Sequence, residues 1–236
     1  KLALQIKAAD ALAPLSSIHL LVNGVPVLPD GQESILDQKV LSFEREYALE
    51  LSPGENRIQA YALNASGAMS IKEYAVVNYT GPVTKGDLHL VLMGASKFQN
   101  DSFNLLYPRE DLEDVAELFG SQRSQFETVQ VHRLIDQDFT AKASEDLLKK
   151  LQDVNVDDRV IIMLATHGML SRDFKYYLAT HDTDFDNPQN TSLPYESLNK
   201  WLMNIPARQK LLLLDACHAG EADSTILKQI EVKNTS

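Results

Sequence analysis

Cys217 and His167 are the two residues whose types and positions could do chemistry together. His167 follows the apolar residues 160–165 with one residue between, and Cys217 comes three residues after the apolar residues 211–214. Chemistry in open α/β sheets gathers at the carboxyl ends of the strands, so two parallel neighbouring strands would bring the thiol and the imidazole to one edge. Because a nearby histidine lowers the pKa of a thiol and the thiolate is the reactive form, this pair predicts a nucleophile and its base.

Small residues follow both side chains. Gly168 comes directly after His167, and Gly220 comes three residues after Cys217, which leaves room for the backbone of a substrate. The backbone N–H groups of Gly168 and Cys217 could bind an oxyanion. The alternative is that Cys217 is a small buried hydrophobe and that His167 is only hydrogen-bonded at the end of its strand.

The elements that must position this pair begin near residue 87. From there apolar strands alternate with amphipathic segments, which predicts a mostly parallel sheet flanked by helices, an α/β fold. We expect helices at 108–121, 140–151 and 195–205, and strands at 88–93, 129–134, 160–165 and 211–214. The strands at 160–165 and 211–214 are apolar almost throughout, which favours burial on both faces.

The first 82 residues follow a different pattern. Asn23-Gly24 between two apolar runs predicts a tight hairpin, and residues 52–55 and 64–67 predict further turns between short alternating strands. This spacing is typical of a small all-β sandwich, which we expect to be Ig-like. We therefore predict a sandwich domain at 1–82 and an α/β domain at 83–236.

Composition excludes several classes of protein. The 236 residues contain 22 Lys+Arg and 33 Asp+Glu, a net charge of −11, so no overall basic surface for nucleic acid is expected. A single cysteine excludes an internal disulfide framework and a Cys-rich zinc site. No apolar run reaches the roughly 20 residues that a membrane span needs. We expect no nucleic acid or membrane partner, and a free thiol favours a cytoplasmic location.

Four blocks of the α/β part occur in an order and at a spacing that resemble the caspase/metacaspase superfamily of cysteine peptidases. The blocks are a first strand with its loop at 88–98, a first helix at 105–115, the strand and His-Gly at 160–168, and the strand and Asp-x-Cys-His-x-Gly at 211–220. The sequence is most similar to bacterial caspase-like proteins, which often carry a β-sandwich beside the peptidase domain. Ala165-Thr166 replaces the usual Ser-Gly before the histidine, and Ala219 replaces a usual Ser, but the pair is kept.

The resemblance implies roles for individual residues. Cys217 would be the nucleophile, His167 the proton-transfer partner, and the N–H groups of Gly168 and Cys217 the oxyanion hole. Metacaspases cleave after Arg or Lys, and the two carboxylates of their acidic pocket match Asp215 and Asp111. A buried pair of carboxylates would bind a guanidinium with two hydrogen bonds. The alternative for Asp111 is a capping or solvent-facing role at its helix.

Three further expectations concern partners and metals. Protein or peptide substrates are implied, with no cofactor required. Some metacaspases need calcium, so the acidic residues 181–187 are a candidate loop, although they lack the glycine and the distal glutamate of an EF-hand and a solvated loop is the favoured interpretation. Only about 19 residues follow Cys217, fewer than caspase-like folds usually have there. One explanation is a C-terminal small-subunit fragment of the same precursor as a partner, and the alternatives are a loop that begins here or a sequence that is cut short.

The sequence leaves three rival functions open. A caspase-like domain that no longer cleaves could serve as an interaction or scaffold module, and a peptidase of this type could prefer Asp. A transition-metal site at His167, His181, Cys217 and His218 is the third rival, but adjacent Cys and His residues cannot easily bind one ion from a rigid strand end.

Overall fold

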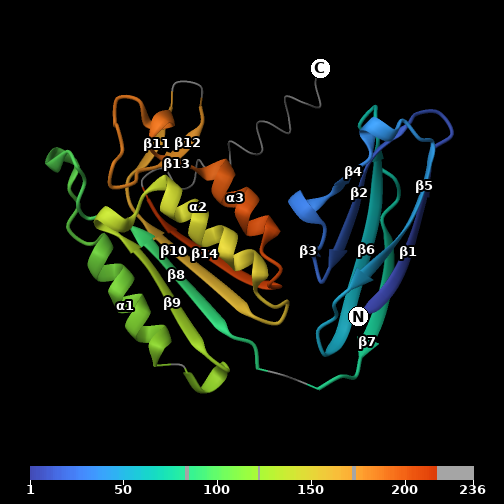
Figure 1. Cartoon of the computed structure of the whole chain (residues 1–236), viewed down its shortest axis with the longest axis horizontal. Coiled ribbons are helices and arrows are strands. Elements are labelled where there is room, and N and C mark those ends of the chain that lie inside the picture. Colours follow the sequence, from blue (N-terminus) through green and yellow to red (C-terminus); the bar gives the residue numbers. More distant parts are fainter. Residues whose placement is uncertain (83–84, 122, 172–173, 217–236) are drawn as a thin grey trace. The chain divides into compact units, whose positions relative to one another are not determined.

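A computed structural model of the protein describes residues 1–82, 85–121, 123–171 and 174–216. The chain divides into two compact units (Figure 1). The first contains residues 1–84 with the short segments 154–157 and 203–208, and the second contains the remainder. Within the described parts of the chain, no helix is long and apolar enough to cross a membrane.

The first unit is built from antiparallel strands in two sheets. One sheet pairs β1 (Leu2–Ala9) with β5 (Ser42–Leu49). The other has the order β3-β2-β6-β7, with β4 also pairing β2. Its strands are β2 (Leu15–Val22), β3 (Val25–Pro26), β4 (Glu33–Ser34), β6 (Gly54–Asn64) and β7 (Glu73–Tyr79).

One hydrophobic core joins these two sheets. Ile6 and Phe43 reach it from the first sheet, and Ile18, Leu20 and Ile58 reach it from the second. Ile6 and Phe43 alternate with exposed residues along β1 and β5, as expected where a sheet buries a single face, whereas the neighbours of Ile18 and Leu20 in β2 are themselves buried or half-buried. The predicted hairpin at Asn23-Gly24 is confirmed: both residues have positive φ, 54° and 81°, between β2 and β3. The first unit is therefore all-β, as the turn spacing predicted.

The second unit is organised around a four-stranded parallel sheet of order β14-β10-β8-β9. Every neighbouring pair in it is parallel. The strands are β8 (Leu88–Gly94), β9 (Val129–Ile135), β10 (Arg159–Ala165) and β14 (Gln209–Asp215). Together with its helices this sheet confirms the α/β fold class.

Three helices cover this sheet. They are α1 (Pro108–Gly120), α2 (Ala141–Lys150) and α3 (Tyr195–Asn204). Leu112 and Ala116 of α1 pack on Leu90 and Leu92 of β8. The opposite face of β8, with Val91, is fully buried, and α2 and α3 lie over the sheet there (Figure 1).

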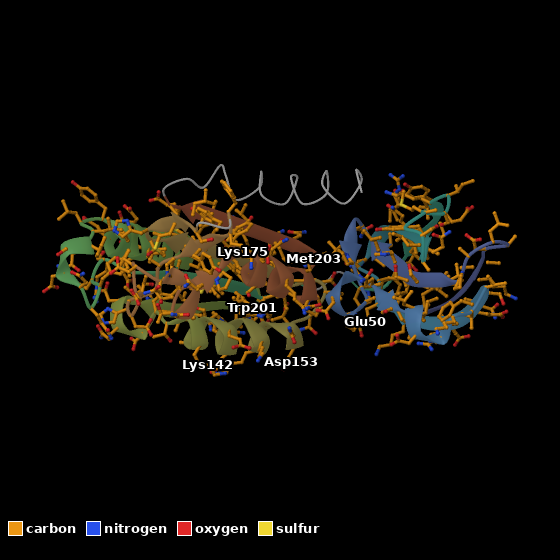
Figure 2. All side chains as sticks on the ribbon, turned by 90° about the horizontal axis from the view of Figure 1, so that it is seen from above. Glu50, Lys142, Asp153, Lys175, Trp201 and Met203 are labelled. Atoms are coloured by element: carbon orange, nitrogen blue, oxygen red, sulfur yellow. The ribbon has the colours of Figure 1, made fainter. Side chains whose placement is uncertain are left out.

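Local sequence explains where these helices begin and how they face. Pro108 occupies the first turn of α1, where a backbone N–H has no acceptor within the helix, so the N–H that proline lacks costs no hydrogen bond. The Thr140 hydroxyl accepts a hydrogen bond from the Ala143 N–H and caps α2. On its solvent side α2 carries charged pairs four residues apart, such as Lys142 with Asp146, and Figure 2 shows Lys142 on the outer side of this helix.

Shorter elements complete the second unit. A small antiparallel sheet follows β10 and consists of β11 (Gly168–Leu170), β12 (Tyr176–Leu178) and β13 (Leu193–Pro194). Short 3₁₀ turns occur in both units, at Pro29–Gly31, Leu36–Gln38, Asp101–Phe103, Arg123–Gln125, Asp136–Asp138, Leu151–Asp153 and Pro188–Asn190.

The expectation that the last strand is buried on both faces is wrong. Leu211 and Leu213 of β14 are 47% and 37% exposed. Among the described residues β14 pairs with β10 alone, so it is an edge strand. An apolar run indicates a strand in a covered sheet but does not distinguish a central strand from an edge one.

Candidate active site

The carboxyl ends of β10 and β14 lie side by side, as the sequence predicted for the strands that precede His167 and Cys217. The strands are parallel neighbours, with Ala165 opposite Asp215. The Thr166 N–H donates a hydrogen bond to the Asp215 carbonyl at 3.1 Å. His167 therefore follows a residue that is tied directly to the end of β14. Cys217 lies outside the described residues, as do His218 and Gly220.

A pocket of about 460 Å³ opens at this edge of the sheet. It brings together three of the residues singled out in the sequence: His167, Asp111 and Asp215. The other lining residues come from the segment before α1 and from the two strand ends: Leu105, Leu106, Tyr107, Pro108, Thr166 and Ala216. Leu106 and Tyr107 are 82% and 64% exposed, so the pocket has an apolar rim beside its two carboxylates.

The two carboxylates have no hydrogen-bond or ion-pair partner among the described residues. Asp111 lies in the first turn of α1 but does not cap it, because the N-cap position is Tyr107. Asp111 is half-buried and Asp215 is exposed. The expectation of a buried pair is thus wrong, because β14 is the edge strand of the sheet among the described residues. Two unpaired negative charges in one pocket favour a cationic ligand.

His167 is held by one ring nitrogen. Its Nε2 lies 2.8 Å from the carbonyl oxygen of Phe103, the last residue of a 3₁₀ turn. A carbonyl oxygen can only accept, so Nε2 must carry the hydrogen. In the neutral imidazole the remaining nitrogen, Nδ1, is then the one with a free lone pair. This arrangement leaves Nδ1 as the atom that can take a proton from a nucleophile.

Three phenylalanines surround the imidazole, and we call them the aromatic cluster: Phe98, Phe103 and Phe185. Their ring centroids lie 5.3, 6.4 and 5.8 Å from that of His167. Phe103 and Phe185 also stack on each other, with centroids 3.7 Å apart and planes 7° from parallel. The histidine is thus packed against aromatic rings from two different loops.

The loop that presents the Phe103 carbonyl is closed by its own hydrogen bonds. The Asn104 side-chain oxygen accepts from the Phe98 N–H at 2.8 Å. The Leu105 N–H donates to the Ser96 carbonyl at 2.9 Å, which joins the two ends of the segment. The Phe103 carbonyl therefore sits on a short, internally bonded loop at the end of β8.

Asp136 anchors the start of the same loop. Its buried carboxylate accepts from the N–H groups of Ser96 and Lys97, at 2.8 and 3.0 Å, and from Arg109 at 2.8 Å. Asp136 has a φ of 54°, a left-handed conformation that aspartate tolerates better than most residues. Asp136, directly after β9, thereby holds the backbone of Ser96 and Lys97, directly after β8.

Gly168 has its N–H directed away from the neighbouring strand. The Ala179 N–H donates to the His167 carbonyl, and Gly168 stands opposite Leu178 in the antiparallel register of β11 and β12. That pattern makes Gly168 and Leu178 a non-hydrogen-bonded pair, so the ladder does not use the Gly168 N–H. The bonds between β11 and β12 therefore leave this N–H unused, and Gly168 does not line the pocket.

The acidic segment 181–187 uses two of its carboxylates within its own loop. Asp184 accepts from the Asn187 side chain and from the N–H groups of Asp186 and Asn187, and these hydrogen bonds lower its pKa. Asp182 accepts from the Thr180 hydroxyl. Across the described part of the chain, no three His, Cys, Asp or Glu side chains are grouped to hold a metal ion.

Several residues of this site were not found from sequence. Phe103 contributes its backbone carbonyl, and because every residue has one, the residue type gives no indication of this role. The aromatic cluster had a signal that could have been used, because Phe98, Phe103 and Phe185 are large apolar residues in otherwise polar loops. Leu106 and Tyr107 fall within the block at 105–115 but are assigned no binding role from the sequence, and their exposure identifies them as the pocket rim.

The chain is weakly similar to several solved structures. Fibronectin(III)-like modules of Clostridium thermocellum CbhA are 20% identical, and the match covers 33% of this chain and 78% of that one with a TM-score of 0.25. A polysaccharide deacetylase of Bacillus cereus is 8% identical over 90% of this chain and 69% of its own, with a TM-score of 0.21. Scores this low support no argument about fold or function. No curated protein matches the chain.

A family model described as Caspase domain, which belongs to a peptidase family, matches residues 89–235. This match covers more than half of the chain, from β8 through the pocket residues and beyond β14. It includes His167 and Cys217 in sequence order. The chain therefore belongs to the caspase family of cysteine peptidases.

Proposed function

We propose that the protein is a cysteine endopeptidase that cleaves peptide bonds after Arg and, less efficiently, after Lys. The observation that carries this proposal is the single pocket lined by His167 and by two unpaired carboxylates, Asp111 and Asp215. It lies at the end of the strand whose continuation, two residues on, is Cys217. The proton acceptor His167 and the two carboxylates thus share one pocket, and the thiol of Cys217 follows Asp215 by two residues in the sequence.

In the proposed first step His167 Nδ1 takes the proton of the Cys217 thiol. The sulfur forms a bond to the scissile carbonyl carbon, and the N–H groups of Gly168 and Cys217 bind the negative oxygen. The C–N bond then breaks while His167 returns the proton to the leaving amine. A water molecule, deprotonated by the same nitrogen, releases the acyl group from sulfur.

Specificity in this proposal comes from charge. A guanidinium entering the pocket would meet two carboxylates that no described residue neutralises, and its aliphatic stem would lie on the apolar rim of Leu106 and Tyr107. Arg is preferred to Lys because its planar group can donate two hydrogen bonds to one carboxylate. An Asp side chain would be repelled by the same two charges.

The test is a set of fluorogenic peptides that differ only in the residue before the cleaved bond: Arg, Lys, Asp or Gln. We expect cleavage in the order Arg, Lys, Gln, with no turnover of the Asp peptide and none by Cys217→Ala. Cleavage of the Asp peptide in preference to the Arg peptide would contradict the specificity. No cleavage, together with no labelling of Cys217 by an arginyl acyloxymethyl ketone, would instead favour a silent scaffold domain.

A further inference from the structure

Phe185 contacts both the histidine and the residue that orients it, yet it does not line the pocket. Its ring stacks flat on Phe103, with centroids 3.7 Å apart and planes 7° from parallel. Its face-to-edge contact with His167 has a centroid distance of 5.8 Å and an angle of 83°. One side chain from the loop between β12 and β13 therefore packs on the hydrogen-bond acceptor residue and on the imidazole together.

We propose that Phe185 is a positioning residue that keeps the hydrogen of His167 on Nε2 and leaves Nδ1 free as the base. The inference rests on the proposed function, because it assigns a role in the proton transfer by His167. Phe185 acts through Phe103: the stacked rings hold the Phe103 carbonyl where it accepts from Nε2, and the edge contact sets the plane of the imidazole.

The loop that carries Phe185 is rigid enough for this task. Asp184, the residue before it, accepts two backbone hydrogen bonds from Asp186 and Asn187, and its own N–H donates to the Thr191 hydroxyl at 2.8 Å. The loop is also tied to the segment after β8. His181 Nδ1 donates to the Lys97 carbonyl at 2.7 Å, and the Gln99 N–H donates to the His181 carbonyl at 2.9 Å.

The Phe103 turn needs such a partner. It is a single 3₁₀ turn whose other residues, Asp101 and Ser102, are exposed. Its side-chain hydrogen bonds are the Asn100 cap and the two bonds of the Asn104 side chain, and none of them is made by the Phe103 carbonyl itself. Without the Phe185 ring the carbonyl can drift from Nε2, and the neutral imidazole can then place its hydrogen on Nδ1. A molecule in that tautomer has no lone pair on Nδ1 to accept the proton, and misplacement by about 1 Å costs on the order of 100-fold in rate.

The kinetic test compares three variants of the full chain. Phe185→Leu keeps an apolar side chain but removes the flat ring, Phe185→Tyr restores the ring, and Phe126→Leu removes a buried ring next to β9 at the opposite end of the sheet. We expect Phe185→Leu to lower kcat about 10- to 100-fold with KM nearly unchanged. Phe185→Tyr should recover most of that loss, and the double variant with Phe103→Leu should add little to it.

A second readout does not depend on peptidase activity. In ¹⁵N-histidine-labelled protein at neutral pH, two-bond ¹H–¹⁵N spectra identify which ring nitrogen of His167 carries hydrogen, with His167→Gln used to assign the signal. We expect the Nε2–H form in the wild type and in Phe126→Leu, and a mixture of both tautomers in Phe185→Leu. The proposal would be overturned if Phe185→Leu kept the pure Nε2–H form, or if it raised KM and left kcat unchanged. A wild type that cleaves no peptide would refute the proposed function, while the spectra would still decide the role of Phe185.

Discussion

Asp111, in the first turn of α1, and Asp215, the last residue of β14, line the same pocket without a partner among the described residues. We predict that Asp111→Asn and Asp215→Asn each lower kcat/KM for the Arg peptide about 10- to 100-fold, since a hydrogen bond to a charged group contributes about 1.5–3 kcal/mol. Cleavage of a neutral Gln peptide should change little.

The matched control for this prediction is Asp114→Asn, which removes the same charge from the exposed side of the same helix. It should leave cleavage of the Arg peptide within about twofold, because a screened surface charge contributes little. An equal loss in Asp114→Asn and Asp111→Asn would show a general charge effect and would contradict a role for Asp111 in the pocket.

Gly94 ends β8 against the carbonyl oxygen of Ala165 and the Leu112 side chain, and a methyl group there would overlap both. We predict that Gly94→Ala destabilises the protein by about 1–3 kcal/mol, because the backbone just before His167 must move. Chemical unfolding measures this change. Gly120→Ala, in open space at the end of α1, should be neutral or stabilising, so equal losses in both variants would refute the steric explanation.

Asp136 accepts three hydrogen bonds although its carboxylate is almost fully buried. Asp136→Ala leaves the N–H groups of Ser96 and Lys97 without their acceptor, and we expect it to lower the free energy of unfolding by about 3 kcal/mol. Asp136→Asn keeps an oxygen acceptor and tolerates the positive φ, so its loss should be clearly smaller. Urea unfolding of the two variants provides the comparison, and identical losses would contradict this account.

The lowered pKa of His132 predicts that the stability of the fold depends on pH. Burial lowers its pKa below the usual 6.5, and the neighbouring charges of His89 and Lys150 lower it further. As the pH falls below about 6.5, the unfolded chain takes up a proton here that the folded protein does not, so the folded state loses stability. His132→Phe and His132→Gln should both reduce the fall in melting temperature between pH 7 and pH 5. If neither variant changes the slope, His132 is not its source.

The acidic segment 181–187 leads to a prediction about metal removal. Asp182 and Asp184 already accept hydrogen bonds from their own loop. We expect EGTA to leave cleavage of the Arg peptide unchanged, and added calcium to have no effect on it. A rate that falls in chelator and returns with calcium, but not with magnesium, would reverse this expectation and assign the loop a calcium site.

Residue patterns were sufficient to predict the main elements of the second unit. The helices expected at 108–121 and 140–151 occur at Pro108–Gly120 and Ala141–Lys150, because their apolar spacing, the proline and the threonine cap all favour the same ends. The apolar strands were also found, and their parallel order follows from their alternation with helices. The exposure of Leu211 and Leu213 was not predicted, since a strand's place in a sheet depends on which other strands pair with it.

The sequence likewise predicted some features of the candidate site and not others. His167, Asp111 and Asp215 share a pocket because strand ends and a helix start meet at one edge of a parallel sheet, which sequence order predicts. The supports of His167 depend instead on the conformation of loops. The left-handed conformation of Asp136 and the position of the Phe103 carbonyl are determined by hydrogen bonds between segments far apart in sequence. No local sequence pattern predicts either of them. The catalytic roles of Cys217, His167 and Gly168 and the substrate-binding roles of Asp111 and Asp215 stay predictions.

The bond from the Thr166 N–H to the Asp215 carbonyl has a consequence for how the proposed enzyme would choose among peptides. If Asp215 anchors the incoming side chain as proposed, this bond joins the anchor to the segment that bears the imidazole, and a ligand that displaced one would displace the other. A poorly fitting peptide would then be turned over slowly even at saturation, and discrimination would show in the rate of a bound complex as well as in its lifetime.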